Sequence, residues 1–410
     1  MQWPIRPITL AEEGGVCDPE RMKASVGWTT ARGLMVTTVA LVSGPVSGWM
    51  RAEAGETVVT LGAKEALRLL DNCAAGAASC EALDDAIMHG RLSEAAFPGV
   101  LSGLTKLCET APAEGCRLLA SVYHQGSGVP KDDARFLSLL RRSCSAGHPI
   151  GCRRVAACHM HGLGTSVDLA QAKVFYRRAC EIKDMVACND LGIVLVENRA
   201  MPDLREADRL WRMACDNGVA GACRNLGGQL YQSTVPERRA EAAAFIQRAC
   251  EGGEGDACTS LGTMYAQGSE VPLDLAQAYR WFRDGCDKAD MQGCNNQGVL
   301  LRDGRGVPRD EKTAAVAFGR ACSGNYVDAC ANLARLLLNN GPLDKKQAVT
   351  LLERACVQKS GLACYNLASL HSQGLAVPLN LEKARGLLVE SCAFPFQLSC
   401  DALKRFDRAP

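Results

Sequence analysis

The stretch LGTMYAQGSEVPLDLAQAYRWFRDGC, residues 261–286, holds the pattern that recurs through most of the chain. Apolar and small residues follow each other at helical spacing up to Gly268, and a second helical run follows Asp274. Glycine is typical of a helix C-terminus, and aspartate accepts backbone N–H groups at a helix N-terminus. The stretch therefore predicts a hairpin of two helices, helix A over 258–267 and helix B over 275–286.

The cysteines repeat with the same period as this hairpin. The chain has 22 cysteines, and twenty of them form ten pairs that follow each other every 34 to 36 residues. Nine pairs are C-x7-C and the first is C-x6-C; Cys17 and Cys158 lie outside the pattern. The pairs are Cys73/Cys80, Cys108/Cys116, Cys144/Cys152, Cys180/Cys188, Cys215/Cys223, Cys250/Cys258, Cys286/Cys294, Cys322/Cys330, Cys356/Cys364 and Cys392/Cys400. A period near 35 from residue 62 onward predicts an array of repeats instead of separate globular domains.

Two further columns support the hairpin. Four residues after the second cysteine, eight of ten repeats have a small residue, and four residues before the first cysteine every repeat has a large apolar or aromatic one. The exceptions in the small column are Asp84 and Lys404, in the first and last copies, where one neighbour is missing. Twelve residues before the first cysteine stands the expected N-cap of helix B: Asp132, Asp168, Asp203, Asp274, Asp310, Asp344 and Asn380.

These residues resemble the Sel1-like (SLR) repeat, a relative of the tetratricopeptide repeat with the pattern LG..Y..G.GV..D...A...F..A. The stretch 261–286 and QGVLLRDGRGVPRDEKTAAVAFGRAC (297–322) carry the resemblance. With its cysteine pairs the chain is similar to the secreted cysteine-rich Helicobacter proteins, which carry a beta-lactamase family label. The resemblance implies an all-α solenoid, a right-handed superhelix of about ten disulfide-stapled hairpins, with helix A lining the concave wall. Three copies (191–215, 226–250, 333–356) lack the GxGV piece, so we expect local irregularity there.

We expect each cysteine pair to form a disulfide. The two cysteines flank a tight turn between helices, and the residue before the second cysteine is always small, which permits the Cα separation of about 5.5 Å that a disulfide prefers. Zinc sites favour C-x2-4-C spacing with four converging ligands, which this spacing and six histidines do not supply. Disulfides require an oxidising compartment, so the protein is expected to be secreted or periplasmic.

The N-terminal residues fit this location. Residues 22–54 read as a signal peptide, with a positive start at Lys23, an apolar run over 34–42 and cleavage after Ala54. Residues 1–21 would be an upstream extension, and 55–410 the repeat array. The alternative is an anchor retained in the membrane, because residues 33–50 carry no charge.

Composition excludes several classes of protein. The chain has 46 basic and 45 acidic residues, which argues against a nucleic-acid binder, and no run outside the N-terminus is long and apolar enough for a multi-span membrane protein. We expect a monomer without a cofactor. Cys158 is expected to be a buried core residue. His159 and His161, two residues apart, point to different faces of a helix, so no metal site is predicted.

Enzyme activity is a weaker hypothesis. The beta-lactamase label implies binding or hydrolysis of penicillins, but the chain has no S-x-x-K, S-D-N, K-T-G or G-x-S-x-G motif, and HMHGLG has glycine where a zinc hydrolase needs aspartate. Catalytic residues therefore stay unassigned. We interpret the chain as a scaffold, and keep a beta-lactamase-like hydrolase as the alternative.

A polar column gives the candidate binding residues. It stands two residues after the second cysteine, on helix A, where amides recur; a second polar column follows seven residues later, from His89 to Gln373. Side-chain amides offer donors and acceptors to a peptide backbone or a glycan, although a solvated helix face explains them equally well. The binding candidates are Arg154, Asp190, Asn225, Asn296, Asn332 and Asn366. The expected partner is a protein, a peptide or a peptidoglycan fragment in the concave groove.

Overall fold

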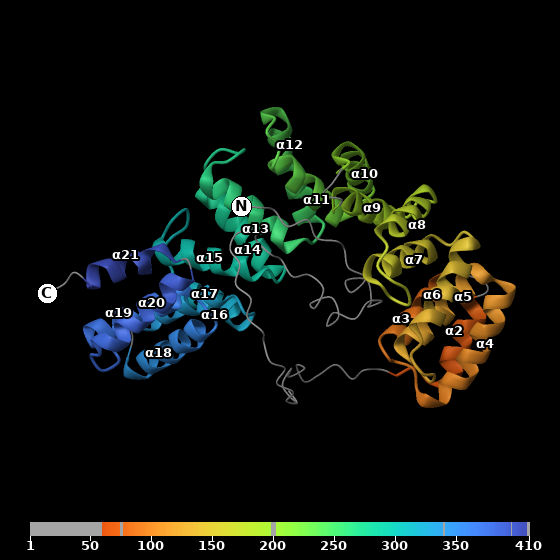
Figure 1. Cartoon of the computed structure of the whole chain (residues 1–410), viewed down its shortest axis with the longest axis horizontal. Helices are drawn as coiled ribbons and strands as arrows, with labels where there is room; N and C mark the ends of the chain where they lie inside the picture. The colour runs from red at the N-terminus through yellow and green to blue at the C-terminus, as the bar shows by residue number, and fades with distance from the viewer. Residues whose placement is uncertain (1–59, 74–76, 198–201, 339–340, 395, 408–410) are drawn as a thin grey trace. The chain divides into compact units, whose positions relative to one another are not determined.

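The computed structural model describes residues 60–73, 77–197, 202–338, 341–394 and 396–407 (Figure 1). The predicted extension 1–21, the signal peptide 22–54 and Cys17 lie outside these residues. The described chain consists of twenty α-helices and one 3-10 helix, with an isolated bridge between Leu61 and Leu92. It divides into two compact units at Asn217 and Gly218, an N-terminal unit and a C-terminal unit.

The N-terminal unit contains a single helix followed by four hairpins, and its order is α2 (Ala63–Cys73), α3 (Ala77–Met88), η1 (Glu94–Ala96), α4 (Phe97–Thr110), α5 (Pro112–Gln125), α6 (Asp133–Ser145), α7 (Pro149–His161), α8 (Leu169–Glu181), α9 (Met185–Glu197) and α10 (Leu204–Asp216). The odd-numbered helices from α3 onward are A helices, and the even-numbered ones are B helices. Each helix from α4 onward packs on the next along the chain, whereas α3 packs on α2 and α5, and α5 also contacts α7.

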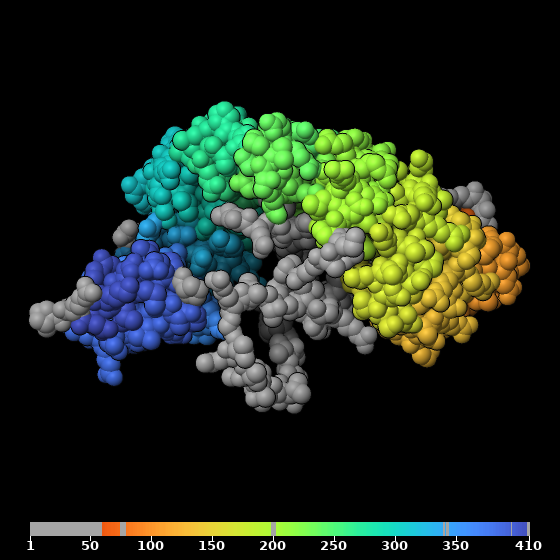
Figure 2. All heavy atoms as spheres, turned by 45° about the horizontal axis from the view of Figure 1, so that its top comes forward, coloured from red at the N-terminus to blue at the C-terminus, as the bar shows by residue number. Residues whose placement is uncertain are grey.

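The C-terminal unit continues the same pattern, with five hairpins and a final single helix: α11 (Ala220–Tyr231), α12 (Pro236–Glu251), α13 (Gly255–Gln267), α14 (Leu275–Asp287), α15 (Met291–Asp303), α16 (Glu311–Ser323), α17 (Val327–Leu337), α18 (Pro342–Val357), α19 (Gly361–Gln373), α20 (Leu381–Ala393) and α21 (Gln397–Phe406). In the space-filling view these helices follow each other in chain order, from green to blue (Figure 2). The predicted all-α repeat fold is confirmed over the described residues.

The small column and the large column meet inside the hairpins whose small residue is glycine. A Cβ built on Gly298 of α15 would lie 2.7 Å from the ring of Phe318 on α16, and one on Gly192 of α9 would lie 2.5 Å from Trp211 on α10. Phe318 and Trp211 are fully buried. The repeats require a small residue at this position because it lets the two helices approach across a large side chain.

The helix ends follow the predicted caps with one exception. The side chains of Asp132, Asp168, Asp203, Asp274, Asp310 and Asn380 each accept a backbone N–H in the first turn of a B helix. The prediction for Asp344 is wrong, because α18 begins at Pro342 and Asp344 lies inside its first turn. In the repeats of α12 and α18 the GxGV loop is missing, and both helices have 16 residues where α14 and α16 have 13. Proline is tolerated at the first helical position, so these helices start about one turn earlier.

Within each unit, disulfides join the B helices to the A helices that follow them. Nine bridges have Cα–Cα separations of 4.4 to 4.8 Å, and in each the cysteines lie inside the two helices. The structure contains Cys73–Cys80, Cys108–Cys116, Cys144–Cys152, Cys180–Cys188, Cys250–Cys258, Cys286–Cys294, Cys322–Cys330, Cys356–Cys364 and Cys392–Cys400. Cys215 and Cys223 are also disulfide-bonded.

Candidate binding surface

The candidate binding residues all lie on A helices, but the two units use them differently. In the N-terminal unit Arg154 on α7 is buried, and its Nη2 lies 3.0 Å from Oδ2 of Asp84 on α3. Its Nη1 donates to Ser121 Oγ on α5 at 3.0 Å. Asp190 on α9 is also buried and accepts a hydrogen bond from Asn189 at 3.2 Å. In this unit the polar column is therefore engaged in internal contacts.

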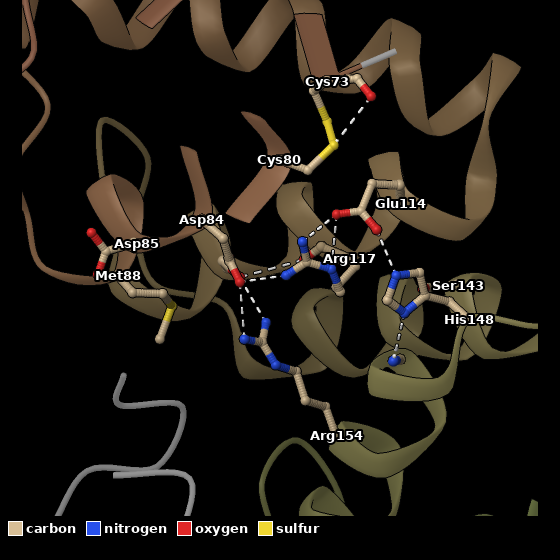
Figure 3. Close-up of polar contacts among 12 residues, drawn as sticks. Cys73, Cys80, Asp84, Asp85, Met88, Glu114, Arg117, Ser143, His148 and Arg154 are labelled. Carbon is tan, nitrogen blue, oxygen red and sulfur yellow. Dashed lines mark hydrogen bonds and ion pairs between the residues drawn. A yellow bond between two sulfur atoms is a disulfide. The ribbon is translucent and has the colours of Figure 1, made fainter. Parts of the chain in front are cut away.

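Asp84 is the centre of a buried charge cluster across α3, α5 and α7 (Figure 3). Ser121 Oγ donates to its Oδ1 at 2.7 Å, and Arg117 forms an ion pair with its Oδ2. Arg117 lies between Asp84 and Glu114, and its Nε donates to Glu114 Oε1 at 3.1 Å. Asp84 stands where α3 lacks the close packing on the following B helix, and its carboxylate holds two arginines of later repeats.

A histidine extends the cluster to the start of α7. His148 Nδ1 accepts the backbone N–H of Gly151 at 3.2 Å, so the ring proton is on Nε2, which donates to Glu114 Oε2 at 2.5 Å. His148 is thus both the N-cap of α7 and a contact to the preceding A helix. Together these contacts pair two arginines with two carboxylates.

The charges of the cluster stabilise one another. Burial alone would raise the pKa of Asp84, but the charges of Arg154 and Arg117 outweigh it and hold that pKa below its usual value. Burial opposes ionisation of Glu114 as well, and hydrogen bonds from His148 and Arg117 still lower its pKa to about 2. The balanced charge indicates a structural role for the cluster, which links three successive repeats. The sequence signal for it was Asp84 itself, which breaks a column of glycine and alanine.

In the C-terminal unit the amides form a ladder from one A helix to the next. Asn332 Nδ2 on α17 donates to Asn295 Oδ1 on α15 at 2.9 Å, and Asn332 Oδ1 accepts from Arg302 Nη1 at 3.2 Å. Asn296 and Asn366 on α15 and α19 are partly exposed, and no described group is hydrogen-bonded to the side chain of Asn366. We call the surface formed by Asn296, Asn332 and Asn366 the amide face. Asn225 on α11 is fully buried, with an exposed fraction of 0%.

The second polar column is more exposed. Three of its residues lie at the C-terminal ends of α13, α15 and α19, and all three are exposed: Gln267, Asp303 and Gln373. Gln373 Nε2 donates to Ser369 Oγ within the same helix at 2.8 Å. Asp303 forms an ion pair with Arg302, its neighbour in sequence, at 2.6 Å. On α15 and α19 this column lies two helical turns after the residues of the amide face.

The cysteine and histidine cluster of α7 takes part in packing. Cys158 is buried with a free thiol. The His159 ring is buried, stacks on Phe175 with centroids 5.8 Å apart, and its Nε2 lies 3.2 Å from Arg141 Nη2. His161 is exposed, so these two histidines do not converge.

Two groups of ligand-type side chains do converge among the described residues. They are Cys73, Cys80 and Glu114, and Cys356, Cys364 and Glu390. In both groups the cysteines are disulfide-bonded, and a metal ligand needs the free thiolate. Neither group is therefore a metal site in the oxidised protein.

Comparison with protein families identifies the repeat. The Sel1 repeat model matches six segments that together make up slightly more than half of the chain, residues 113–148, 149–184, 255–290, 292–325, 327–358 and 361–393. No curated protein matches the sequence. Among the described residues, no helix has the length and apolarity that a membrane span requires.

Two solved structures show the same fold, and a third is similar in sequence over part of the chain. A Sel1 repeat protein from Oxalobacter formigenes superposes with a TM-score of 0.57 at 18% identity, over 87% of this chain and 98% of that one. A protective antigen of uropathogenic Escherichia coli with an SLR fold gives 0.50 at 17% identity, over 82% and 81%. Cysteine-rich protein B of Helicobacter pylori is 29% identical over 32% of this chain and 93% of that one, with a TM-score of 0.27.

Proposed function

The chain belongs to the Sel1 repeat family, a type of scaffold typical of protein–protein interaction, and from this premise we propose that it binds an extended polypeptide along the amide face of its C-terminal unit. Repeat proteins of this kind present successive helices with similar spacing, so one side chain from each repeat can meet successive parts of a linear ligand. The partner is then a protein segment, a free peptide or the peptide part of a cell-wall fragment.

The observation that carries this proposal is the set of amides on α15, α17 and α19. A side-chain amide provides two N–H donors and a carbonyl acceptor, the same groups that an extended peptide backbone presents. The contact between Asn332 and Asn295 fixes one amide of the ladder in place, while the amide of Asn366 keeps its hydrogen-bonding capacity for a ligand. In the N-terminal unit Arg154 and Asp190 are held by other protein groups, so the proposal places the ligand on the C-terminal unit.

We propose an extracytoplasmic location for this scaffold. The number of disulfides is typical of a protein from an oxidising compartment. A signal peptide at residues 22–54 would export the chain, and mass spectrometry of the exported protein would then find Gly55 at its N-terminus. An exported chain that retains residues 33–50 would support the membrane-anchor alternative instead. The hydrolase alternative stays a prediction.

Selection from a random peptide library on the oxidised protein tests the binding function. Selected peptides should bind the variant Asn296→Ala/Asn332→Ala/Asn366→Ala at least about tenfold more weakly, because each lost hydrogen bond contributes about 0.5–1.5 kcal/mol. Asn225 is left out because it is buried, and its replacement would disturb the fold.

The matched control removes two amides from B helices, Gln247→Ala/Gln277→Ala on α12 and α14. It should leave the affinity of the selected peptides unchanged. Peptides that bind the triple variant as tightly as the parent protein would show that the ligand lies on another surface.

A further inference from the structure

Two arginines of neighbouring repeats lie beside the amide face. Arg302 is in the last turn of α15, and Arg335 is on α17, three residues after Asn332 and therefore on the same side of that helix. Arg302 Nη1 donates to Asn332 Oδ1 at 3.2 Å, which joins the two helices at this point. Basic side chains thus stand next to the amides that we assign to the peptide backbone.

Arg302 is held in a defined position. Its Nε and Nη2 donate to the two carboxylate oxygens of Asp303 at 2.6 and 2.9 Å, and its guanidinium carbon lies 5.9 Å from the ring centre of Phe318. The side chain is 14% exposed, and each of its three guanidinium nitrogens donates a hydrogen bond within the protein. A planar group fixed in this way loses little conformational freedom when it binds an anion.

Positive charge exceeds negative charge at this place. The positive charges of three arginines lower the pKa of the single carboxylate of Asp303; they belong to Arg302, Arg335 and Arg305. Burial and the neighbouring charge of Arg302 lower the pKa of Arg335, so the two guanidinium groups repel each other. Arg335 is exposed, and among the described residues it has no carboxylate within ion-pair distance. An added anion would relieve this repulsion.

We propose that Arg302 and Arg335 receive a side-chain carboxylate of an acidic, extended peptide whose backbone lies on the amide face. This rests on the proposed function and names the chemistry of its partner. The charge excess favours an anion, and the exposed guanidinium of Arg335 offers the paired donors that a carboxylate accepts, with the fixed positive charge of Arg302 beside it. The adjacent amide of Asn332 favours an anion carried on a chain with backbone groups.

Two labelled peptides of equal length, (Gly-Glu)6 and (Gly-Gln)6, test the proposal by fluorescence anisotropy with the oxidised protein. The acidic peptide should bind at least about tenfold more tightly, as expected for charge-assisted hydrogen bonds, and added salt should reduce the difference. Arg335→Gln should abolish the difference, and Arg335→Lys should retain part of it.

The matched control is Arg283→Gln on α14. Arg283 also pairs with the aspartate that follows it, Asp284, but on a B helix, and its side chain is 50% exposed. This variant should keep the full preference for the acidic peptide. An equal loss in Arg283→Gln and Arg335→Gln would show non-specific attraction and overturn the proposal.

Other outcomes separate this proposal from the proposed function. If both peptides bind equally and the triple asparagine variant weakens both, the amide face binds peptides without a preference for acid, and only the present proposal fails. If neither peptide binds, an acidic linear partner is ruled out, while the library selection decides the proposed function independently.

Discussion

Arg154 on α7 reaches past a whole repeat to Asp84 on α3, 70 residues earlier in the chain, with Nη2 and Oδ2 3.0 Å apart. The repeat between them contributes Arg117 and Ser121 to the same carboxylate. Three successive A helices therefore depend on one side chain in the first of them.

Replacing this carboxylate should destabilise the first repeats. Asp84→Asn keeps the shape of the side chain but leaves two buried arginines without their shared anion, and loss of one partner of a buried ion pair costs about 3–5 kcal/mol. Hydrogen exchange of α3 and α5, followed with urea, should report the loss. The control Asp85→Asn removes a half-exposed carboxylate paired with Arg91 and should cost less than about 1 kcal/mol. Equal protection in both variants would contradict the structural role of the cluster.

Burial of His124 should make the protein sensitive to mild acid. Burial and the charge of Lys131 lower the pKa of His124 from 6.5 to about 4, and its ring stacks on Phe136. The folded state binds the proton more weakly than the unfolded state, so stability is complete above pH 6.5 and falls by about 3 kcal/mol as the pH drops to about 4. Thermal unfolding of His124→Gln should lose this dependence between pH 6.5 and 4. The exposed His89 is the control, and His89→Gln should keep it.

Glu114 should add a second loss at lower pH. Its pKa of about 2 lies below the ordinary 4.5, so its contribution to stability is complete above pH 4.5 and is lost as the pH falls towards 2. The loss is less than about 3 kcal/mol, because Glu114 is partly exposed and water screens its contacts. Glu114→Gln should be less stable at neutral pH and show a flatter acid limb below pH 4.5, whereas Glu81→Gln, an exposed residue of α3, should behave as the parent. If the stability of Glu114→Gln fell below pH 4.5 as steeply as that of the parent protein, the contacts with Arg117 and His148 would be contradicted.

The small column should not accept a single methyl group at Gly298. Gly298→Ala would place Cβ against the ring of Phe318 and should destabilise the C-terminal unit by about 1–3 kcal/mol, as overpacking does. The control is Gly319→Ala on the adjacent helix, where nothing lies within 4 Å of the new Cβ, and which should stabilise by about 0.4–1 kcal/mol. Melting temperatures of the two variants should therefore move in opposite directions. If both melting temperatures moved in the same direction, the two helices of the hairpin would be able to move apart and accept the methyl group.

The oxidised chain from Gly55 should contain one free thiol. Cys158 is buried, so a thiol reagent should find no reactive group in the native protein and one after denaturation without reductant. Cys158→Ala should give none. Two or more thiols in the denatured parent would show that some of the predicted bridges do not form.

The fold could be predicted from the sequence because its determinants are local. Within about one period, each repeat contains the residues that set its helix ends, its small and large contact residues and its cysteines. The start of α18 was missed because it depends on a shortened loop, which moved the helix start from Asp344 back to Pro342. Local rules place a cap correctly only where the loop before it has its usual length.

The candidate site was less predictable because it depends on contacts between repeats. Arg154 and Asn332 occupy the same position in their repeats, yet one is buried in an ion cluster and the other bridges two amides and an arginine. What distinguishes them is the residue that neighbouring helices present, Asp84 in one case and Asn295 in the other. Arg335 carried no signal of its own, since its importance arises from the nearby charge of Arg302.

Every described cystine spans seven or eight positions of sequence, and none ties together remote parts of the chain. A gene duplication or deletion of one period therefore adds or removes a complete cystine and leaves no cysteine orphaned. The number of repeats can therefore change in evolution while every remaining cysteine keeps its disulfide partner. The length of the array, and with it the length of ligand that it spans, can be selected independently of oxidative folding.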